Sequence, residues 1–194
     1  MDIADVKSKL EQAFPGIALR PVRDTLLMEN AKDIVKIAQF LKDSPDYQLD
    51  YLSSLTGADY LEYLEVVYHL YSMEKKTGPL VLRVRVKHDH AQVPSLVSVY
   101  RGAEYQERET YDMYGVVFEN HPDPRRIFMW EGFEGFPLRK DYQQEDSETL
   151  EMEDIEWLEK HGIPVPQDLS AKAEELKKLG RRAVAQKPGQ PEPE

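Results

Sequence analysis

The chain has 194 residues, with 36 acidic and 25 basic side chains and a net charge of −11. This charge argues against a nucleic-acid-binding protein and against direct adhesion to an anionic membrane, because both functions need a basic surface. The sequence contains no Cys, which excludes disulfides, Cys-ligated iron–sulfur clusters and thiolate zinc sites. The first residues carry no secretory signal and no apolar run is long enough for a transmembrane helix, so we expect a soluble, cytoplasmic chain.

The N-terminal part predicts two amphipathic helices separated by extended chain. Residues 2–14 place apolar side chains at helical spacing. Residues 17–28 predict an interrupted strand. A second helix begins after Asn30, which can cap it. We expect the apolar stripe of this helix in the core: Ile34, Ile37, Ala38 and Leu41.

Three further strands are predicted from apolar residues at every second position. They cover 47–51, with a turn at 57–59, and then 64–71 and 80–87. Short turns between such strands predict an antiparallel meander. Residues 94–100 predict a helix, because Pro suits a first helical turn. Together these elements predict an α+β fold, a mostly antiparallel sheet covered by helices, with an extended loop-rich and helical C-terminal arm.

The segment 105–142 is the densest in charged, aromatic, Gly and Pro residues. It opens on a helix on which Glu104, Arg108 and Asp112 share one face with alternating charge. Gly115 can end that helix. The prolines and large apolar residues that follow predict an ordered loop region. Two hypotheses remain open here: arginine–carboxylate pairs hold the loop onto its own domain, or the loop is a contact surface for another protein.

The composition changes after residue 142. Residues 143–180 predict an arm with a mostly acidic helix and a second helix with a thin apolar stripe. Residues 181–194 lack large apolar side chains and predict a disordered tail. The predicted organisation is therefore an α+β domain at 1–142, which includes 105–142, followed by this arm and tail.

Two groups of residues could carry chemistry in a different class of protein. The first could form the metal site of a stand-alone hydrolase, although no further ligand follows at a recognisable spacing: His88, His90, His121 and Asp123. The second is the set of carboxylates on the helix near 104–112, but alternating charges on a helix are more typical of a surface. No short motif for nucleotide binding or covalent catalysis occurs. A free-standing acidic adaptor is a further alternative.

A family resemblance rests on two blocks of the segment 105–142. The blocks are ERETYDMYGVVFENHPDPRRI at 107–127 and GFPLRKDY at 135–142. In this order they resemble the C subunit of the proton-pumping NADH-quinone oxidoreductase, the peripheral-arm small subunit of respiratory complex I. The sequence departs from the common family residues at three positions: Tyr105 replaces Trp, Pro124 replaces Leu and Phe136 replaces His.

The resemblance implies a cofactor-free scaffold subunit with no catalytic, cofactor-binding or metal site of its own. The enzyme would be a membrane-bound complex that couples electron transfer from NADH to quinone with proton translocation. NADH, flavin, iron–sulfur clusters and quinone would be bound by partner subunits. The chain would dock beside the quinone-proximal large subunit and the cluster-bearing subunits, as a peripheral protein on the cytoplasmic side of the cell membrane, without inserting into it. An equivalent subunit of a membrane-bound hydrogenase or ferredoxin-linked complex is the alternative.

The resemblance also indicates which positions to expect at a subunit interface. They are the residues that match the family blocks: Glu107, Arg108, Glu109, Asp112, Gly115, His121, Pro122, Arg125, Arg126, Pro137, Leu138, Arg139, Lys140 and Asp141.

Overall fold

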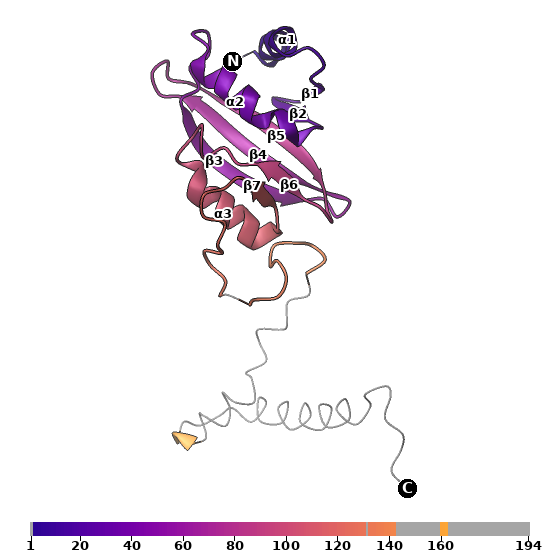
Figure 1. Ribbon diagram of the computed structural model, residues 1–194, viewed down its shortest axis with the longest axis vertical. Helices are drawn as coiled ribbons and strands as arrows, with labels where there is room; N and C mark the ends of the chain where they lie inside the picture. Colours follow the sequence, from indigo (N-terminus) through magenta and orange to yellow (C-terminus); the bar gives the residue numbers. More distant parts are fainter. Residues whose placement is uncertain (1, 131, 143–159, 163–194) are drawn as a thin grey trace. The chain divides into compact units, whose positions relative to one another are not determined.

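The computed structural model describes residues 2–130, 132–142 and 160–162. The chain divides into two units, Met1–Gln143 and Gln144–Glu194. Except for residues 160–162, the predicted arm and tail lie outside the described residues. The elements of the first unit follow in this order (Figure 1): α1 (Ile3–Ala13), β1 (Leu19–Val22), β2 (Thr25–Met28), the 3-10 helix η1 (Ala31–Asp33), α2 (Ile34–Asp43), β3 (Tyr51–Asp59), β4 (Tyr63–Ser72), β5 (Thr77–Lys87), β6 (Gln92–Pro94), α3 (Ala103–Tyr114) and β7 (Val117–Glu119).

A five-stranded sheet with the strand order β1-β2-β5-β4-β3 forms the centre of the first unit. Its neighbouring strands are antiparallel except for β2 and β5, which are parallel. The predicted α+β fold with a mostly antiparallel sheet is confirmed. β6 and β7 form a separate parallel pair in which Val93 lies opposite Phe118. Within the described ranges, every helix is too short or too polar to span a lipid bilayer.

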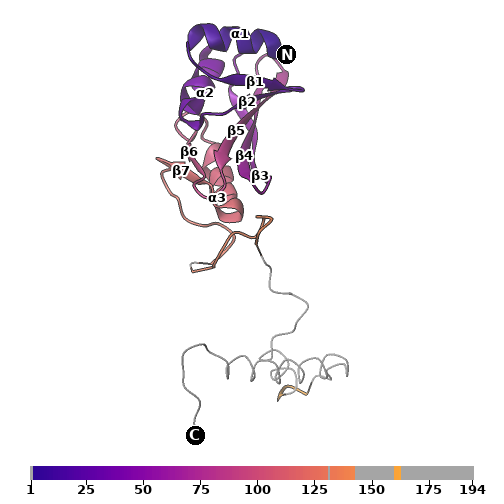
Figure 2. The ribbon, with the colours of Figure 1, turned by 90° about the vertical axis from the view of Figure 1, so that its right-hand side faces the viewer.

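One face of the sheet forms the hydrophobic core with the helices. On β4 the alternating apolar side chains from Leu64 to Leu70 are fully buried, as the period-2 pattern predicts. The apolar stripe of α2 belongs to the same buried cluster, which confirms its predicted place in the core. Figure 2 shows α2 and α3 on the same side of the sheet. This arrangement places α3 against β3 and leads the chain from α3 into the loop region that follows.

The predicted turn at 57–59 is wrong, and β3 (Tyr51–Asp59) begins where the predicted strand at 47–51 ends. Gly57 lies inside β3. A Cβ at this position would come within 2.5 Å of the Tyr114 ring. The glycine therefore allows α3 to approach the strand closely, which is a known role of glycine within strands besides its role in turns.

The predicted helix at 94–100 is also wrong. A single turn forms there, in which the amide of Tyr100 donates to the carbonyl oxygen of Leu96 at 2.7 Å. The amide of Leu96 donates to the side chain of Glu107 at 2.7 Å, and the hydroxyl of Tyr100 donates to the carbonyl oxygen of Leu49, also at 2.7 Å. These contacts between distant parts of the chain hold the segment in a non-helical path, and local sequence spacing gives no sign of them.

Candidate functional site

Helix α3 carries the start of the first family block and ends at Gly115. This residue has φ +71° and ψ 28°, and its amide donates to the carbonyl oxygen of Tyr111 at 2.8 Å. The left-handed conformation is the one predicted for a helix-ending glycine. A Cβ at Gly115 would also overlap the ring of Phe136. Glycine is therefore needed here both for the backbone turn and for the packing of the second block onto the helix.

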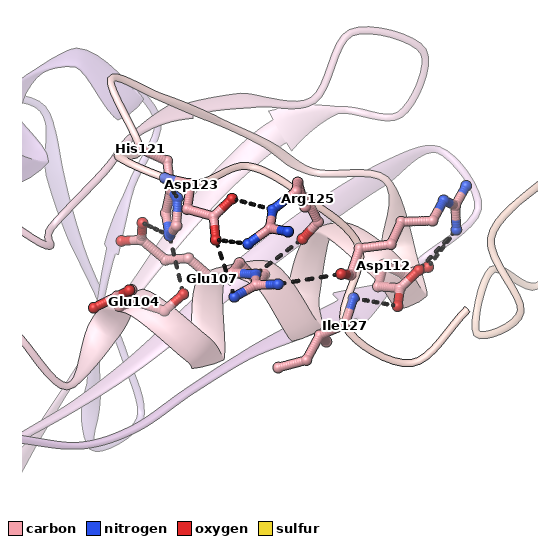
Figure 3. A network of polar contacts seen from close by, with 9 residues as sticks. Glu104, Glu107, Asp112, His121, Asp123, Arg125 and Ile127 are labelled. Atoms are coloured by element: carbon pink, nitrogen blue, oxygen red, sulfur yellow. Dashed lines mark hydrogen bonds and ion pairs between the residues drawn. The ribbon is translucent and has the colours of Figure 1, made fainter. Parts of the chain in front are cut away.

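The carboxylate of Asp112 organises the start of the following loop (Figure 3). Its side chain is fully buried. One oxygen accepts hydrogen bonds from three consecutive backbone amides, those of Ile127, Phe128 and Met129, at 3.1, 2.6 and 2.9 Å. The other accepts a hydrogen bond from Arg126 at 2.8 Å. Burial opposes ionisation of Asp112, but these donors outweigh it and hold its pKa below the usual value.

Arg126 connects the same carboxylate to the second half of the loop. Besides Asp112, its guanidinium donates to the carbonyl oxygens of Phe133 and Gly135, each at 3.2 Å. It also lies 5.2 Å from the centre of the Phe136 ring, within the range of a cation–π interaction. A single arginine thus fixes the path of the chain between the two family blocks.

Arg108 binds the following loop rather than its neighbours on the helix. Its guanidinium donates to the carbonyl oxygens of Arg125 and Arg126, at 2.9 and 3.2 Å. It also lies 3.4 Å from the carboxylate of Asp123, and its side chain is only 13% exposed. The predicted pairing with the other charged residues of its helix face is therefore wrong. A hydrogen bond from Arg125 and the nearby charge of Arg108 lower the pKa of Asp123 to about 2.

Glu107 is a second fully buried carboxylate on α3. Its oxygens accept hydrogen bonds from the Ser95 hydroxyl at 2.6 Å and from the Leu96 amide at 2.7 Å. Burial raises the pKa of Glu107 to about 7 despite these two bonds. The hydroxyl of Tyr68, also fully buried, has no hydrogen-bond partner among the described residues. Glu107 thus ties the segment after β6 to the helix and is not displayed at a surface.

His121 is held as a neutral imidazole between two backbone groups. Its Nδ1 accepts a hydrogen bond from the Asp123 amide at 3.0 Å, so its Nε2 carries the proton and donates to the carbonyl oxygen of Glu104 at 2.9 Å. Nε2 lies 3.9 Å from the carboxylate of Glu107. Because both ring nitrogens are engaged by the backbone, this histidine is poorly placed to act as a general base.

The second family block lies against the end of α3 and the end of β3. The amide of Leu138 donates to the carbonyl oxygen of Met113 at 3.0 Å. The side chain of Arg139 donates to the carbonyl oxygen of Tyr114 at 2.7 Å, and the amide of Lys140 donates to the carboxylate of Asp59 at 2.8 Å. The fold therefore brings the two family blocks together around one helix end.

The expected interface residues differ widely in exposure. Glu107, Asp112 and Gly115 are buried, and Arg108, His121, Arg126, Pro137 and Arg139 are half-buried. The exposed ones are Glu109, Pro122, Arg125, Leu138, Lys140 and Asp141. Most of the charged family residues thus hold the loop in place, and only some can contact a partner from this chain's surface.

Four exposed apolar residues on this loop were not all expected at an interface. Phe128 is 61% exposed, Trp130 68% and Leu138 52%, and Ile127 stands beside Phe128 at 36%. We name these four residues the apolar crest. Only Leu138 was among the predicted interface residues. The aromatic density of the segment was the signal that could have identified the other members, because aromatic residues are enriched at interface centres.

The predicted hydrolase site is not assembled. Among the described residues, no three of its four predicted ligands have donor atoms within 4.8 Å of one another: His88, His90, His121 and Asp123. The close group of potential ligands that does occur there contains His88 together with Asp59 and Asp141. The hydrolase hypothesis therefore gains no support.

Comparisons with known proteins agree with the sequence blocks. The family described as "Respiratory-chain NADH dehydrogenase, 30 Kd subunit" matches residues 27–148. The NADH-quinone oxidoreductase C subunit 2 of Rhizobium meliloti (strain 1021) is 47% identical over 117 residues, which cover 57% of this chain and 62% of that protein. The NADH-quinone oxidoreductase C subunit of Roseiflexus sp. (strain RS-1) is 40% identical over 147 residues, covering 73% of this chain and 84% of that protein. The chain thus spans less than two thirds of the Rhizobium protein.

A solved structure supports the fold. A chain of the membrane-bound sulfane sulfur reductase (MBS), an archaeal respiratory membrane complex, matches with a TM-score of 0.57 and 21% identity, over 84% of this chain and 93% of that chain. The family match covers both blocks and the side chains that hold the loop onto α3. The chain therefore belongs to the family of the 30 kDa subunit of the respiratory-chain NADH dehydrogenase.

Proposed function

We propose that the chain is a scaffold subunit of a membrane-bound NADH-quinone oxidoreductase, whose reaction couples electron transfer from NADH to quinone with proton translocation. The observation that carries this proposal is the 40% identity with the Roseiflexus C subunit over 84% of that protein. In this proposal the chain carries no redox centre. Partner subunits bind NADH, flavin, iron–sulfur clusters and quinone, and the complex holds the chain on the cytoplasmic side of the cell membrane.

The apolar crest is the proposed docking surface for the quinone-proximal large subunit. Exposed clusters of large apolar side chains are typical of interaction sites, since water solvates them poorly. The backbone under the crest is fixed by Asp112, whose carboxylate binds three successive amides. A surface that is already ordered before binding loses less conformational entropy when the partner arrives. Rigid support and apolar exposure together favour a contact site over a loop held only for its own domain.

The assembly is tested by purifying the tagged chain from detergent-solubilised membranes of its source and identifying its partners by mass. We expect the other subunits of an NADH-quinone oxidoreductase. Deleting the chain should reduce NADH-dependent quinone reduction in membranes, and restoring it should recover the activity. A chain that is recovered alone, with membrane activity unchanged by its deletion, would rule the proposal out.

The docking surface is tested separately with Phe128→Ser and Trp130→Ser. Both side chains are mostly exposed, so the variants should fold normally yet enter the complex poorly on native gels. Loss of a central aromatic anchor weakens binding by about 2–4 kcal/mol. Met73→Ser is the matched control, because Met73 is 57% exposed but lies in the turn after β4. Normal assembly of both crest variants would place the interface elsewhere while leaving the subunit function intact.

A further inference from the structure

Three potential metal ligands converge at the edge where the second family block meets the sheet. Asp59 is the last residue of β3, His88 directly follows β5, and Asp141 lies in the loop after α3. One oxygen of each carboxylate and one imidazole nitrogen all lie within 4.8 Å of one another. The side chains of Asp59 and His88 are 1% and 11% exposed, whereas Asp141 is exposed. The group is therefore mostly enclosed but open to solvent on one side.

The spacing within the group suits a shared cation better than a direct hydrogen bond. Nε2 of His88 lies 3.4 Å from Oδ2 of Asp59. A good hydrogen bond between such atoms is about 2.7–3.2 Å long. Nitrogen and oxygen ligands each about 2.0–2.1 Å from a tetrahedral zinc ion are separated by about 3.4 Å. The two side chains are thus already placed at the separation that a zinc ion between them requires.

The surroundings also resemble those of a metal site. Asp59 is oriented by backbone amides, with Leu61 donating to one oxygen at 2.6 Å and Lys140 to the other at 2.8 Å. Nδ1 of His88 lies 3.8 Å from the carboxylate of Asp89. Hydrogen-bonded carboxylates, and a histidine whose second nitrogen faces a carboxylate, are the usual second layer around zinc.

The charges favour a cation as well. Two carboxylates meet one imidazole, and the Asp59 carboxylate is almost completely enclosed. Two carboxylates held this close repel each other unless a positive charge lies between them. A divalent ion supplies that charge without requiring the imidazole to be protonated.

We propose that Asp59, His88 and Asp141 bind a divalent transition-metal ion such as Zn²⁺, which fastens the second family block to the ends of β3 and β5. Water completes the coordination on the open side. The ion has a structural role, because it joins three segments that are distant in the chain, and it takes no part in electron transfer. This inference rests on the local geometry and does not depend on the proposed function.

The test uses the full-length chain after chelator treatment and dialysis, titrated with ZnCl₂ by isothermal titration calorimetry. We expect one zinc ion per chain. His88→Gln and Asp141→Asn should each weaken binding by at least about tenfold, since each removes a ligand. His90→Gln is the matched control, because it changes an exposed histidine nearby that is not in the group. Zinc should also raise the melting temperature of the wild-type chain and not that of Asp141→Asn.

Circular dichroism of each variant without zinc checks that the fold is kept. Asp59 is left unchanged, because losing its bonds to two amides could unfold the edge of the sheet. The proposal is overturned by an absence of saturable zinc binding. It is equally overturned by binding that survives in either His88→Gln or Asp141→Asn at the wild-type affinity, which would indicate an adventitious ion only.

Discussion

Replacing Asp112 by Asn should remove the support of the apolar crest. The substitution keeps the size of the side chain but replaces one acceptor oxygen with an amide group that only donates. If the remaining oxygen takes the three loop amides, the new NH₂ group faces the guanidinium of Arg126. In the opposite orientation it faces the amides. In both cases buried donors lose their acceptor and Arg126 loses its charged partner.

The expected loss is large compared with the stability of the domain. Removing one member of a buried, hydrogen-bonded charge pair costs about 3–5 kcal/mol. Domains of this kind have about 5–15 kcal/mol in total. Asp123→Asn is the matched control, because the same chemical change affects a pair whose side chains are 30% and 72% exposed. Exposed pairs contribute at most about 1 kcal/mol.

Two measurements separate the outcomes. Urea unfolding followed by circular dichroism gives the change in the free energy of unfolding for both variants. Hydrogen exchange of the amides of Ile127, Phe128 and Met129 reports whether the loop opens locally. We expect faster exchange at these amides in Asp112→Asn and little change in Asp123→Asn. Unchanged exchange, together with an unfolding free energy like that of the control, would refute the role assigned to Asp112.

Two further predictions concern α3. Burial raises the pKa of Glu107 from 4.5 to about 7, so stability should be greatest below about pH 4.5 as far as this group is concerned and should be lost as the pH rises towards 7. Glu107→Gln cannot ionise and should remove this loss, about 3 kcal/mol, in urea unfolding compared at pH 5 and pH 8; an unaltered pH dependence would contradict it. Gly115→Ala should destabilise more than Gly132→Ala, by about 1–3 kcal/mol, because both have positive φ but only at Gly115 would the added Cβ meet the ring of Phe136. Equal effects in thermal unfolding would mean that the backbone conformation alone decides.

Much of the sheet and of the second helix could be predicted from local periodicity. The alternation along β4 and the stripe of α2 both arise because one face of each element is buried in a single core. The prediction failed where a residue had two possible uses. Gly57 was interpreted as part of a turn, but it lies within a strand to make room for the ring of Tyr114. Only the position of α3 distinguishes the two uses.

The sequence by itself determined the family and located the segment that carries it, because those depend on the order of residues along the chain. It also showed which charged residues share a face of α3. Only the tertiary structure decided that Asp112 and Glu107 are buried, since a helical pattern does not reveal which later segment covers that face. A covered carboxylate needs donors to offset its lost hydration. For Asp112 they come from amides 15 to 17 residues further along the chain, and for Glu107 from groups 11 and 12 residues before it.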